Sequence, residues 1–253
     1  MNIEYYIADP AGNITALVTS DVSRDLYKSV SGKIMEKRKN VEQVGFTDFR
    51  TGAVKLNMSG DEFCGNAAMS AAALYGVLTG KSGSFETEIK VSGAAKPVKT
   101  AVREKDGFFE CRCEIERPEK ISETVFSVSG REYRFPLVSF EGISHIVADG
   151  SLSEADAESV IKKLAGKLKV KALGIMIVSD KTGMRPIVYV PGVNTLFYEN
   201  SCASGSCAVA SVLCGPGEEA VLKQPGGEIR VRNAEKLELF GKIKLSKCYS
   251  EEL

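Results

Sequence analysis

The chain has 253 residues, 43% of them hydrophobic, and its 33 basic residues balance 33 acidic ones. This length and apolar content suffice for a large core in one big domain or two small ones, and the balanced charge excludes a global attraction to nucleic acid or to a membrane surface. The sequence shows neither the pattern of a signal peptide nor an apolar run long enough to span a bilayer. We therefore expect a cytoplasmic protein with no nucleic-acid or membrane partner.

Seven cysteines, an odd number without the even spacing of a secreted disulfide framework, fit a reducing compartment. No C-x-x-C pair occurs and His145 is the single histidine, so we expect no metal site. In "FFECRCEI", residues 108–115, the alternation of apolar and charged residues is typical of a strand. Cys111 and Cys113 are therefore expected in the core.

The first half of the chain predicts paired strands around one helix. Residues 4–20 alternate on both sides of a Pro-Ala-Gly-Asn turn, which indicates a hairpin, and residues 53–58 follow as a strand. The small-residue segment 66–80 is expected to be a helix that Gly80 ends. The β-rich stretches that follow it are residues 85–93, 97–104 and 107–115.

The second half repeats this order. Residues 131–150 predict another hairpin, and residues 153–168 an amphipathic helix with Ser153 as its N-cap. Strands are expected at 173–180 and 185–192 before a second cysteine motif, and the chain continues with β-rich stretches at 226–233 and 236–245.

The two cysteine motifs match one another. Placing Cys64 on Cys202 aligns "CGNAAMSAAALYG" with "CASGSCAVASVLC" without a gap, at an offset of 138 residues. Small and apolar residues on every side of both segments predict helices buried all round. We expect an α+β fold of two pseudo-symmetric halves, residues 1–122 and 123–253, each a β-sheet wrapped around a central helix.

Buried packing is the plain interpretation of both cysteines, because free cysteine is among the most buried residue types. Their position favours chemistry, since each stands at the start of its helix after polar residues. The positive end of a helix stabilises a thiolate and is expected to lower a cysteine pKa from about 8.5 toward neutrality, and the same N–H groups bind carboxylates. If the halves face one cleft, the two thiols can move a proton between the faces of one carbon.

These residues resemble the diaminopimelate epimerase superfamily of cofactor-independent amino-acid racemases and epimerases. "CGNAAM" and "SCASGSCAVA" are similar to its C-G-N-G-x-R and A-C-G-[ST]-G-A-C-A motifs, with Cys202 and not Cys207 on the catalytic position. "PAGNITALV" resembles the family's opening segment and puts Asn13 on a substrate-contacting asparagine. "VSFEGISHIVADG" resembles V-x-x-G-N-P-H-x-V, which implies that His145 assists a cysteine. "LKQPGGEIRVR" resembles the C-terminal P-G-G-x-L segment.

The departures from diaminopimelate epimerases concern the substrate. Ala67 and Met69 replace the Gly and Arg that follow C-G-N, and the W-E-R-G-A-G-E-T segment is replaced by "YVPGVNTLFYENSC". "VPGVNTLFYENSC" and "VEQVGF" look most like histidine racemases, where Glu42 would be the acidic residue near the cleft. The resemblance therefore implies histidine, or another monocarboxylic amino acid, as the small-molecule substrate.

The resemblance implies an isomerase without a cofactor, with Cys64, Cys202 and His145 as catalytic residues. It further implies a substrate-binding set made of Asn13, Glu42, Gly65, Asn66, Glu199, Ala203 and Ser204. A diaminopimelate epimerase proper and a non-catalytic amino-acid-binding module stay open as alternatives. Proline and hydroxyproline epimerases and phenazine-pathway isomerases fit the cysteine motifs less well. His145 has the alternative of a partly buried residue that caps a strand, and the oligomeric state is open, a homodimer included.

Overall fold

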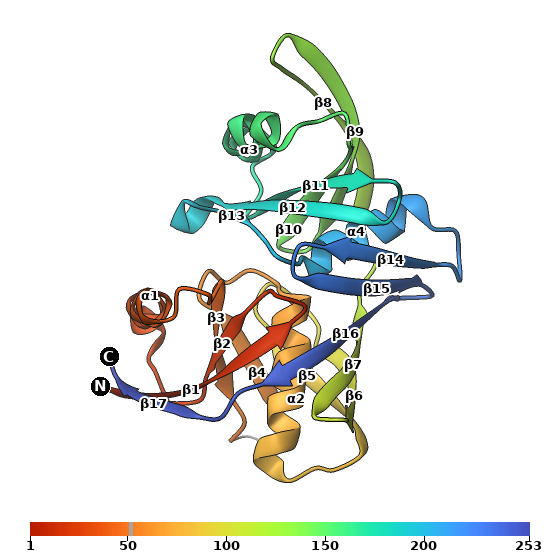
Figure 1. The fold of residues 1–253 in the computed structure, drawn as a ribbon. Coiled ribbons are helices and arrows are strands. Elements are labelled where there is room, and N and C mark those ends of the chain that lie inside the picture. Colours follow the sequence, from red (N-terminus) through yellow and green to blue (C-terminus); the bar gives the residue numbers. More distant parts are fainter. Residues whose placement is uncertain (51–52) are drawn as a thin grey trace. The chain divides into compact units, whose positions relative to one another are not determined.

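The structure is a computed structural model that describes residues 1–50 and 53–253 (Figure 1). The chain forms two compact units, Met1–Glu114 together with Phe240–Leu253, and Ile115–Leu239. The expected division between residues 122 and 123 differs from this one in two places. The chain enters the second unit at residue 115, and residues 240–253 return to the first unit because the C-terminal strands pair with the N-terminal one.

The first unit holds one helix inside a set of strands and one outside it. Its helical segments are η1 (Arg24–Leu26), α1 (Tyr27–Lys37) and α2 (Gly65–Thr79). Its strands are β1 (Asn2–Pro10), β2 (Thr15–Val18), β3 (Gln43–Asp48), β4 (Val54–Met58), β5 (Ser84–Val91), β6 (Val98–Lys105), β7 (Phe108–Ile115), the end of β16 (Leu237–Leu245) and β17 (Tyr249–Glu252).

Strand pairing in the first unit runs in chain order from β1 to β7. The pairs β2–β3 and β4–β5 are parallel, whereas β1–β2, β3–β4, β5–β6 and β6–β7 are antiparallel. β16 pairs with β1 and also with β7. The strands therefore form a closed ring, and α2 packs against five of them.

The composition of α2 explains its burial. Small residues make up most of the helix, with five Ala among its 15 residues, so neighbouring strands can approach it on all sides, and its first ten residues are buried. At its end Gly80 adopts a left-handed conformation with φ 67°, as a C-cap glycine does. The helix predicted at 66–80 and its stop signal are thus confirmed.

The alternation of side chains along β2 and β3 separates two faces. Ala16, Val18, Val44 and Phe46 join a core cluster with α1 on one face. Side chains one position away in sequence point to the opposite face, toward α2. Thr15 and Gln43 belong to that second face and are directly paired in register.

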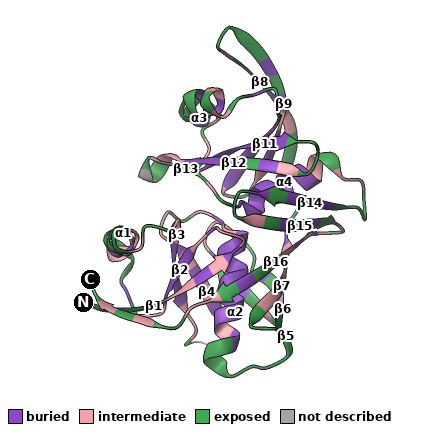
Figure 2. Ribbon diagram, in the orientation of Figure 1, coloured by how far each residue is buried: buried purple, intermediate pink, exposed green. Residues whose placement is uncertain are grey.

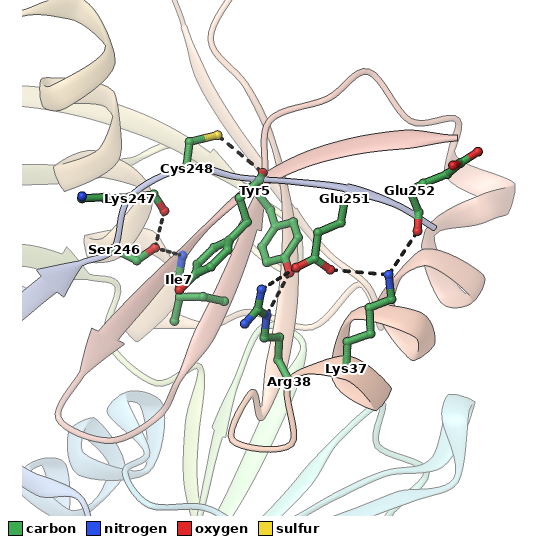
Figure 3. Close-up of polar contacts among 10 residues, drawn as sticks. Tyr5, Ile7, Lys37, Arg38, Ser246, Lys247, Cys248, Glu251 and Glu252 are labelled. Atoms are coloured by element: carbon green, nitrogen blue, oxygen red, sulfur yellow. Dashed lines mark hydrogen bonds and ion pairs between the residues drawn. The ribbon is translucent and has the colours of Figure 1, made fainter.

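A polar cluster joins the C-terminal strand β17 to β1 and α1 within the first unit (Figure 3). The Arg38 guanidinium lies 4.2 Å from the ring centroid of Tyr249, donates to the Tyr5 hydroxyl at 3.2 Å and forms an ion pair with Glu251. Lys37 adds a contact of 3.6 Å to the same carboxylate. These contacts supplement the backbone ladder between β1 and β17.

The second unit has the same kinds of element. Its helical segments are α3 (Glu154–Leu168), η2 (Pro191–Val193) and α4 (Ala203–Leu213). Its strands are β8 (Lys120–Val128), β9 (Arg131–Phe140), β10 (Ile143–Asp149), β11 (Leu173–Ser179), β12 (Gly183–Val190), β13 (Thr195–Tyr198), β14 (Glu219–Gln224), β15 (Gly227–Asn233) and the start of β16.

The middle strands of the second unit are buried on both faces (Figure 2). β10 and β11 run parallel, and Ile146, Ile175 and Ile177 pack against α3 in one apolar cluster. The alternate residues His145, Gly174 and Met176 face the other way, toward α4. Because a helix covers each face of these strands, their sequences are nearly continuous runs of apolar residues.

Several local predictions are confirmed. The hairpins form between β1 and β2 and between β9 and β10. Ser153 caps α3, its side chain accepting from the Asp156 N–H at 3.1 Å. Cys111 and Cys113 lie on the buried face of β7. None of the helices in the described part of the chain has both the length and the apolarity needed to cross a membrane.

Candidate active site

Cys64 is the N-cap of α2, as the sequence predicts. Its backbone is extended, with φ −135° and ψ 110°, and its Sγ accepts from the N–H of Ala67 at 3.4 Å. The side chain is partly exposed. Since the first-turn N–H groups of a helix lack acceptors within the helix, sulfur here performs the capping role that serine or aspartate usually takes.

A chain of amides links Cys64 to the predicted substrate-binding residues of the first unit. The Asn66 side chain donates to Asn13 Oδ1 at 3.1 Å, and the Asn13 side chain donates to a Glu42 oxygen at 2.7 Å. Gln43 Nε2 contacts Asn13 Oδ1 at 2.8 Å and Cys64 Sγ at 3.2 Å. Asn13 and Asn66 are almost fully buried. The structure thus brings Asn13, Glu42, Asn66 and Cys64 together.

Cys202 occupies the matching place in the second unit. It is the N-cap of α4, with φ −125° and ψ 110°, and its Sγ accepts from the Gly205 N–H at 3.4 Å. Gly205 packs closely against Met176, since a Cβ there would lie 2.1 Å from the present position of Met176 Sδ. Unlike Cys64, Cys202 is buried, with 5% of its surface exposed.

Ser204 joins Cys202 to His145. The serine Oγ lies 3.7 Å from Cys202 Sγ and 2.9 Å from His145 Nε2. His145 is fully buried in the middle of β10, and burial lowers its pKa to about 3, so the imidazole is neutral. It fills the space over Gly174, where a Cβ would lie 2.3 Å from Nδ1. His145 neither caps a strand nor contacts solvent.

The protonation state of Cys202 differs from the one expected at a helix N-terminus. Burial, followed by the charge of Glu199 and a hydrogen bond with it, raises the pKa of Cys202 well above its ordinary value. The N–H of Gly205 and the Ser204 hydroxyl act in the opposite direction and are outweighed. The expected lowering of the pKa is therefore wrong for Cys202, because desolvation exceeds the helix contribution. Burial and Glu199 therefore favour the thiol form of Cys202.

Gln224 fixes the backbone around Cys202. Its Oε1 accepts from the Cys202 N–H at 2.7 Å, and its Nε2 donates to Ser206 Oγ at 3.0 Å. Ser206 Oγ in turn donates to the Cys202 carbonyl at 2.7 Å. These buried hydrogen bonds fix the orientation of the Cys202 backbone at the start of α4.

The sequence reasoning missed Gln43 and Gln224 as site residues. Gln43 directly follows Glu42 at the start of β3, and Gln224 ends β14 within the segment that resembles P-G-G-x-L. The available signal was local for Gln224, which continues the buried face of β14 after Ala220 and Leu222, whereas Gln43 stands at the partly exposed start of β3 and gave none. Of the remaining predicted residues, Gly65 and Ala203 are the first residues of α2 and α4, where backbone N–H groups can hold a carboxylate.

Neither Met69 nor Arg185 supplies a buried positive charge near the two cysteines. Met69, at the place of the diaminopimelate epimerase arginine, is fully buried and packs close to Gly241. Arg185 is 65% exposed and forms an ion pair with Glu154 at 3.3 Å. Neither position offers a buried cation for a second substrate carboxylate. Across residues 1–50 and 53–253 no cluster of His, Cys, Asp and Glu suits a metal ion.

The chain is similar in sequence to a known protein family and to two of its relatives. Residues 2–248 match the family model of the histidine racemase CntK N-terminal domain. A histidine racemase of Fusobacterium nucleatum is 34% identical over 238 residues, covering 89% of this chain and 86% of the relative. A histidine racemase of Staphylococcus aureus is 27% identical over 246 residues, covering 90% and 88%.

The fold is also similar to solved structures. The structure of a predicted epimerase from Pseudomonas aeruginosa superimposes with a TM-score of 0.72 at 15% identity, covering 99% of each chain. At that identity the likeness concerns the fold.

Proposed function

Because the chain belongs to the family of the histidine racemase CntK N-terminal domain and is an isomerase of the racemase and epimerase type, we propose that it inverts the Cα centre of histidine. We further propose that Cys64 and Cys202 carry the reaction as a thiolate and a thiol, without pyridoxal phosphate.

The observation that carries this proposal is the equivalence of the two cysteines. Each is an N-cap with ψ 110°, and each Sγ accepts from the N–H three residues later at 3.4 Å. Each starts a small-residue helix that packs against strands. These shared features support two pseudo-symmetric halves, each contributing one thiol to a common substrate.

The proposed reaction moves one proton onto the enzyme and one off it. The Cys64 thiolate takes the Cα proton of the bound amino acid, so that its S–H bond forms while the C–H bond breaks and its electron pair stays on carbon. The Cys202 S–H then gives its proton to the opposite face and becomes the thiolate. The enzyme ends in the mirror state, ready for the opposite enantiomer.

The carbanion is stabilised by the helix ends in this scheme. The substrate carboxylate binds the first-turn N–H groups of Gly65 and Asn66 and of Ala203 and Ser204, where the positive ends of α2 and α4 favour negative charge. Aligned donors are worth most in a site that excludes water. Once Cys202 has lost its proton, the Ser204 hydroxyl can donate to its sulfur.

His145 is a positioning residue in this mechanism. Its contact with Cys202 runs through Ser204, and the ring is fully buried. A neutral imidazole on the far side of the hydroxyl fixes where the serine oxygen lies. His145 therefore acts on the thiol without touching the substrate.

The charges near the cysteines favour histidine over diaminopimelate. A second carboxylate would be buried without an arginine at Met69, which costs several kcal/mol. Glu42 and Glu199 instead provide acceptors for an imidazole N–H or an imidazolium. We propose Glu42, bound to Asn13, and Glu199, beside Cys202, as the acidic residues that select the side chain.

Proton exchange tests the proposal directly. The protein is incubated in D2O with L-histidine, LL-diaminopimelate or L-proline at equal concentration, and Cα deuterium and optical rotation are followed by NMR and polarimetry. We expect histidine to exchange fastest and to lose its rotation. Faster exchange of diaminopimelate would identify a diaminopimelate epimerase, and binding of histidine without exchange would identify a binding module.

A further inference from the structure

Gln43 lies where three acceptors converge on one amide nitrogen. Its Nε2 is 2.8 Å from Asn13 Oδ1, 2.8 Å from Thr15 Oγ1 and 3.2 Å from Cys64 Sγ. An NH2 group carries two hydrogens, so it can fully serve only two acceptors at a time. The sulfur therefore competes with two oxygens for the amide hydrogens of Gln43.

The surrounding bonds determine that the nitrogen, and not the oxygen, of the Gln43 amide faces this cluster. The Asn13 Nδ2 donates to Glu42, which leaves Oδ1 of Asn13 as an acceptor. The Thr15 hydroxyl donates its hydrogen to the Asn13 carbonyl at 3.0 Å, so that its oxygen accepts from Gln43. If the Gln43 amide were flipped, its Oε1 would face the oxygens of Asn13 and Thr15, and no hydrogen would lie between them. The orientation with NH2 toward the cluster is therefore the one that satisfies these hydrogen bonds.

A donor aimed at sulfur favours the thiolate, because hydrogen bonds to a charged acceptor are stronger than those to a neutral one. The helix N–H of Ala67 aims a second donor at the same sulfur. Cys202 has the opposite surroundings, because it is buried and has Glu199 beside it. The two otherwise equivalent cysteines therefore differ in which protonation state their neighbours stabilise.

We propose that Gln43 is a positioning residue that holds Cys64 as the thiolate, so that the resting enzyme has its base in the first unit and its acid, Cys202, in the second. The inference rests on the proposed function for its catalytic meaning. The thiolate itself is measurable without substrate.

The experiment follows alkylation of Cys64 by iodoacetamide between pH 5 and 10, with peptide mapping by mass spectrometry to separate Cys64 from the other cysteines. Gln43→Leu removes the donor, and Gln43→Glu replaces it at the same size by a carboxyl group, which is negative in the upper part of this range. We expect the midpoint of the Cys64 alkylation profile to rise by one to two pH units, roughly what loss of a hydrogen bond to a charged group implies, with the larger shift in Gln43→Glu.

Thr15→Val is the matched control, because it removes a competing oxygen at nearly constant shape and leaves Gln43 in place. We expect its midpoint to stay at the wild-type value or to fall, since both amide hydrogens are then shared by Asn13 and Cys64. If Gln43 acts in packing alone, the midpoint of the Cys64 alkylation profile should rise in neither Gln43 variant, or it should rise in both of them and in Thr15→Val as well. Either result overturns the proposal. Circular dichroism of each variant identifies one that fails to fold, and the second Gln43 variant then decides.

The outcome separates this inference from the proposed function. Shifted alkylation in a wild-type protein that racemises no amino acid would leave the Gln43–Cys64 pairing intact and remove the proposed function. Unshifted alkylation in an active racemase would remove the Gln43 role alone.

Discussion

His145 Nε2 lies 2.9 Å from Ser204 Oγ, while its Nδ1 has no hydrogen-bond partner among the residues that the structure describes. A buried N–H without an acceptor is rarer in proteins than an acceptor without a donor. The arrangement therefore favours the tautomer with hydrogen on Nε2. Ser204 then accepts from His145 and keeps its own hydrogen for Cys202 Sγ.

NMR of the imidazole nitrogens tests this tautomer and its neutrality. His145 is the only histidine in the chain, so labelled histidine gives one pair of side-chain signals. We expect the Nε2–H pattern and no protonation between pH 8 and pH 5, because burial lowers the pKa to about 3. A ring that titrates near pH 6.5 would contradict the burial of His145.

The same shift predicts a pH dependence of stability. An unfolded chain protonates this histidine below about pH 6.5, whereas the folded protein does so only near pH 3. The unfolded state then binds more protons, so the free energy of unfolding from this group falls as pH decreases, by up to about 1.4 kcal/mol per unit. Urea titrations of wild type and His145→Gln from pH 7 to 4.5 should show a steeper decline in wild type.

Ser204→Ala should reduce both stability and activity. The variant leaves His145 Nε2 buried without its partner, at a cost of about 1–3 kcal/mol, and removes the donor to Cys202. Ser211→Ala is the matched control, because Ser211 lies on the same helix and its hydroxyl donates to the Cys207 carbonyl at 2.8 Å. Thermal melts and histidine racemisation rates measure both effects, and equal losses in the two variants would contradict a special role for Ser204.

Replacing either cysteine with serine should lower the racemisation rate without lowering the stability of the fold. Serine is a good N-cap, so Cys64→Ser and Cys202→Ser should retain or gain stability while losing roughly 10²-fold or more in racemisation. Cys248→Ser, at an exposed cysteine, is the control and should keep the wild-type rate. A Cys64→Ser or Cys202→Ser enzyme with wild-type turnover would rule out the two-base scheme.

The contacts of Glu251 predict an acid-sensitive C-terminal strand. Burial alone raises the pKa of Glu251, but the hydrogen bonds and charge of Arg38, together with Tyr5 and Lys37, outweigh it and lower the pKa. The stabilisation is therefore present above the ordinary carboxyl pKa of 4.5 and is lost as pH falls.

Glu251→Gln tests this contribution. We expect the variant to be less stable than wild type by about 1 kcal/mol at pH 7, an amount typical of a partly exposed charged hydrogen bond, and the difference to disappear near pH 3. Denaturant titrations at both pH values measure it. A difference that persists at pH 3 would assign the effect to packing.

The elements that could be predicted from the sequence are those with a local signal. Ser153 before an amphipathic run, Gly80 after a small-residue run, and the turn before Asn13 each act on their own neighbours in the chain. The cysteines at the helix starts belong to the same class. Helix α1 gave a weaker signal, because only Val30, Ser31 and Ile34 of its polar sequence are buried, and it was not predicted. Strand β8 was also not predicted.

The remaining site features depend on contacts between distant residues. Gln43 reaches Cys64 across 21 positions and Gln224 reaches Cys202 across 22, so neither pairing leaves a mark in local spacing. The raised pKa of Cys202 likewise follows from its burial and from Glu199, and not from its place at the start of the helix. Such effects are absent from any single sequence window.

The return of residues 240–253 to the first unit has a consequence for biosynthesis. Residues 1–114 emerge from the ribosome early, but the hydrogen bonds that β1 makes with β16 and β17 can form only after those two strands have been synthesised. The second unit, residues 115–239, is complete in sequence before that point. Domains fold as units during synthesis once their residues have emerged. The later-encoded unit is therefore the first that can reach its final structure, and the N-terminal strands stay incomplete until residues 240–253 have emerged.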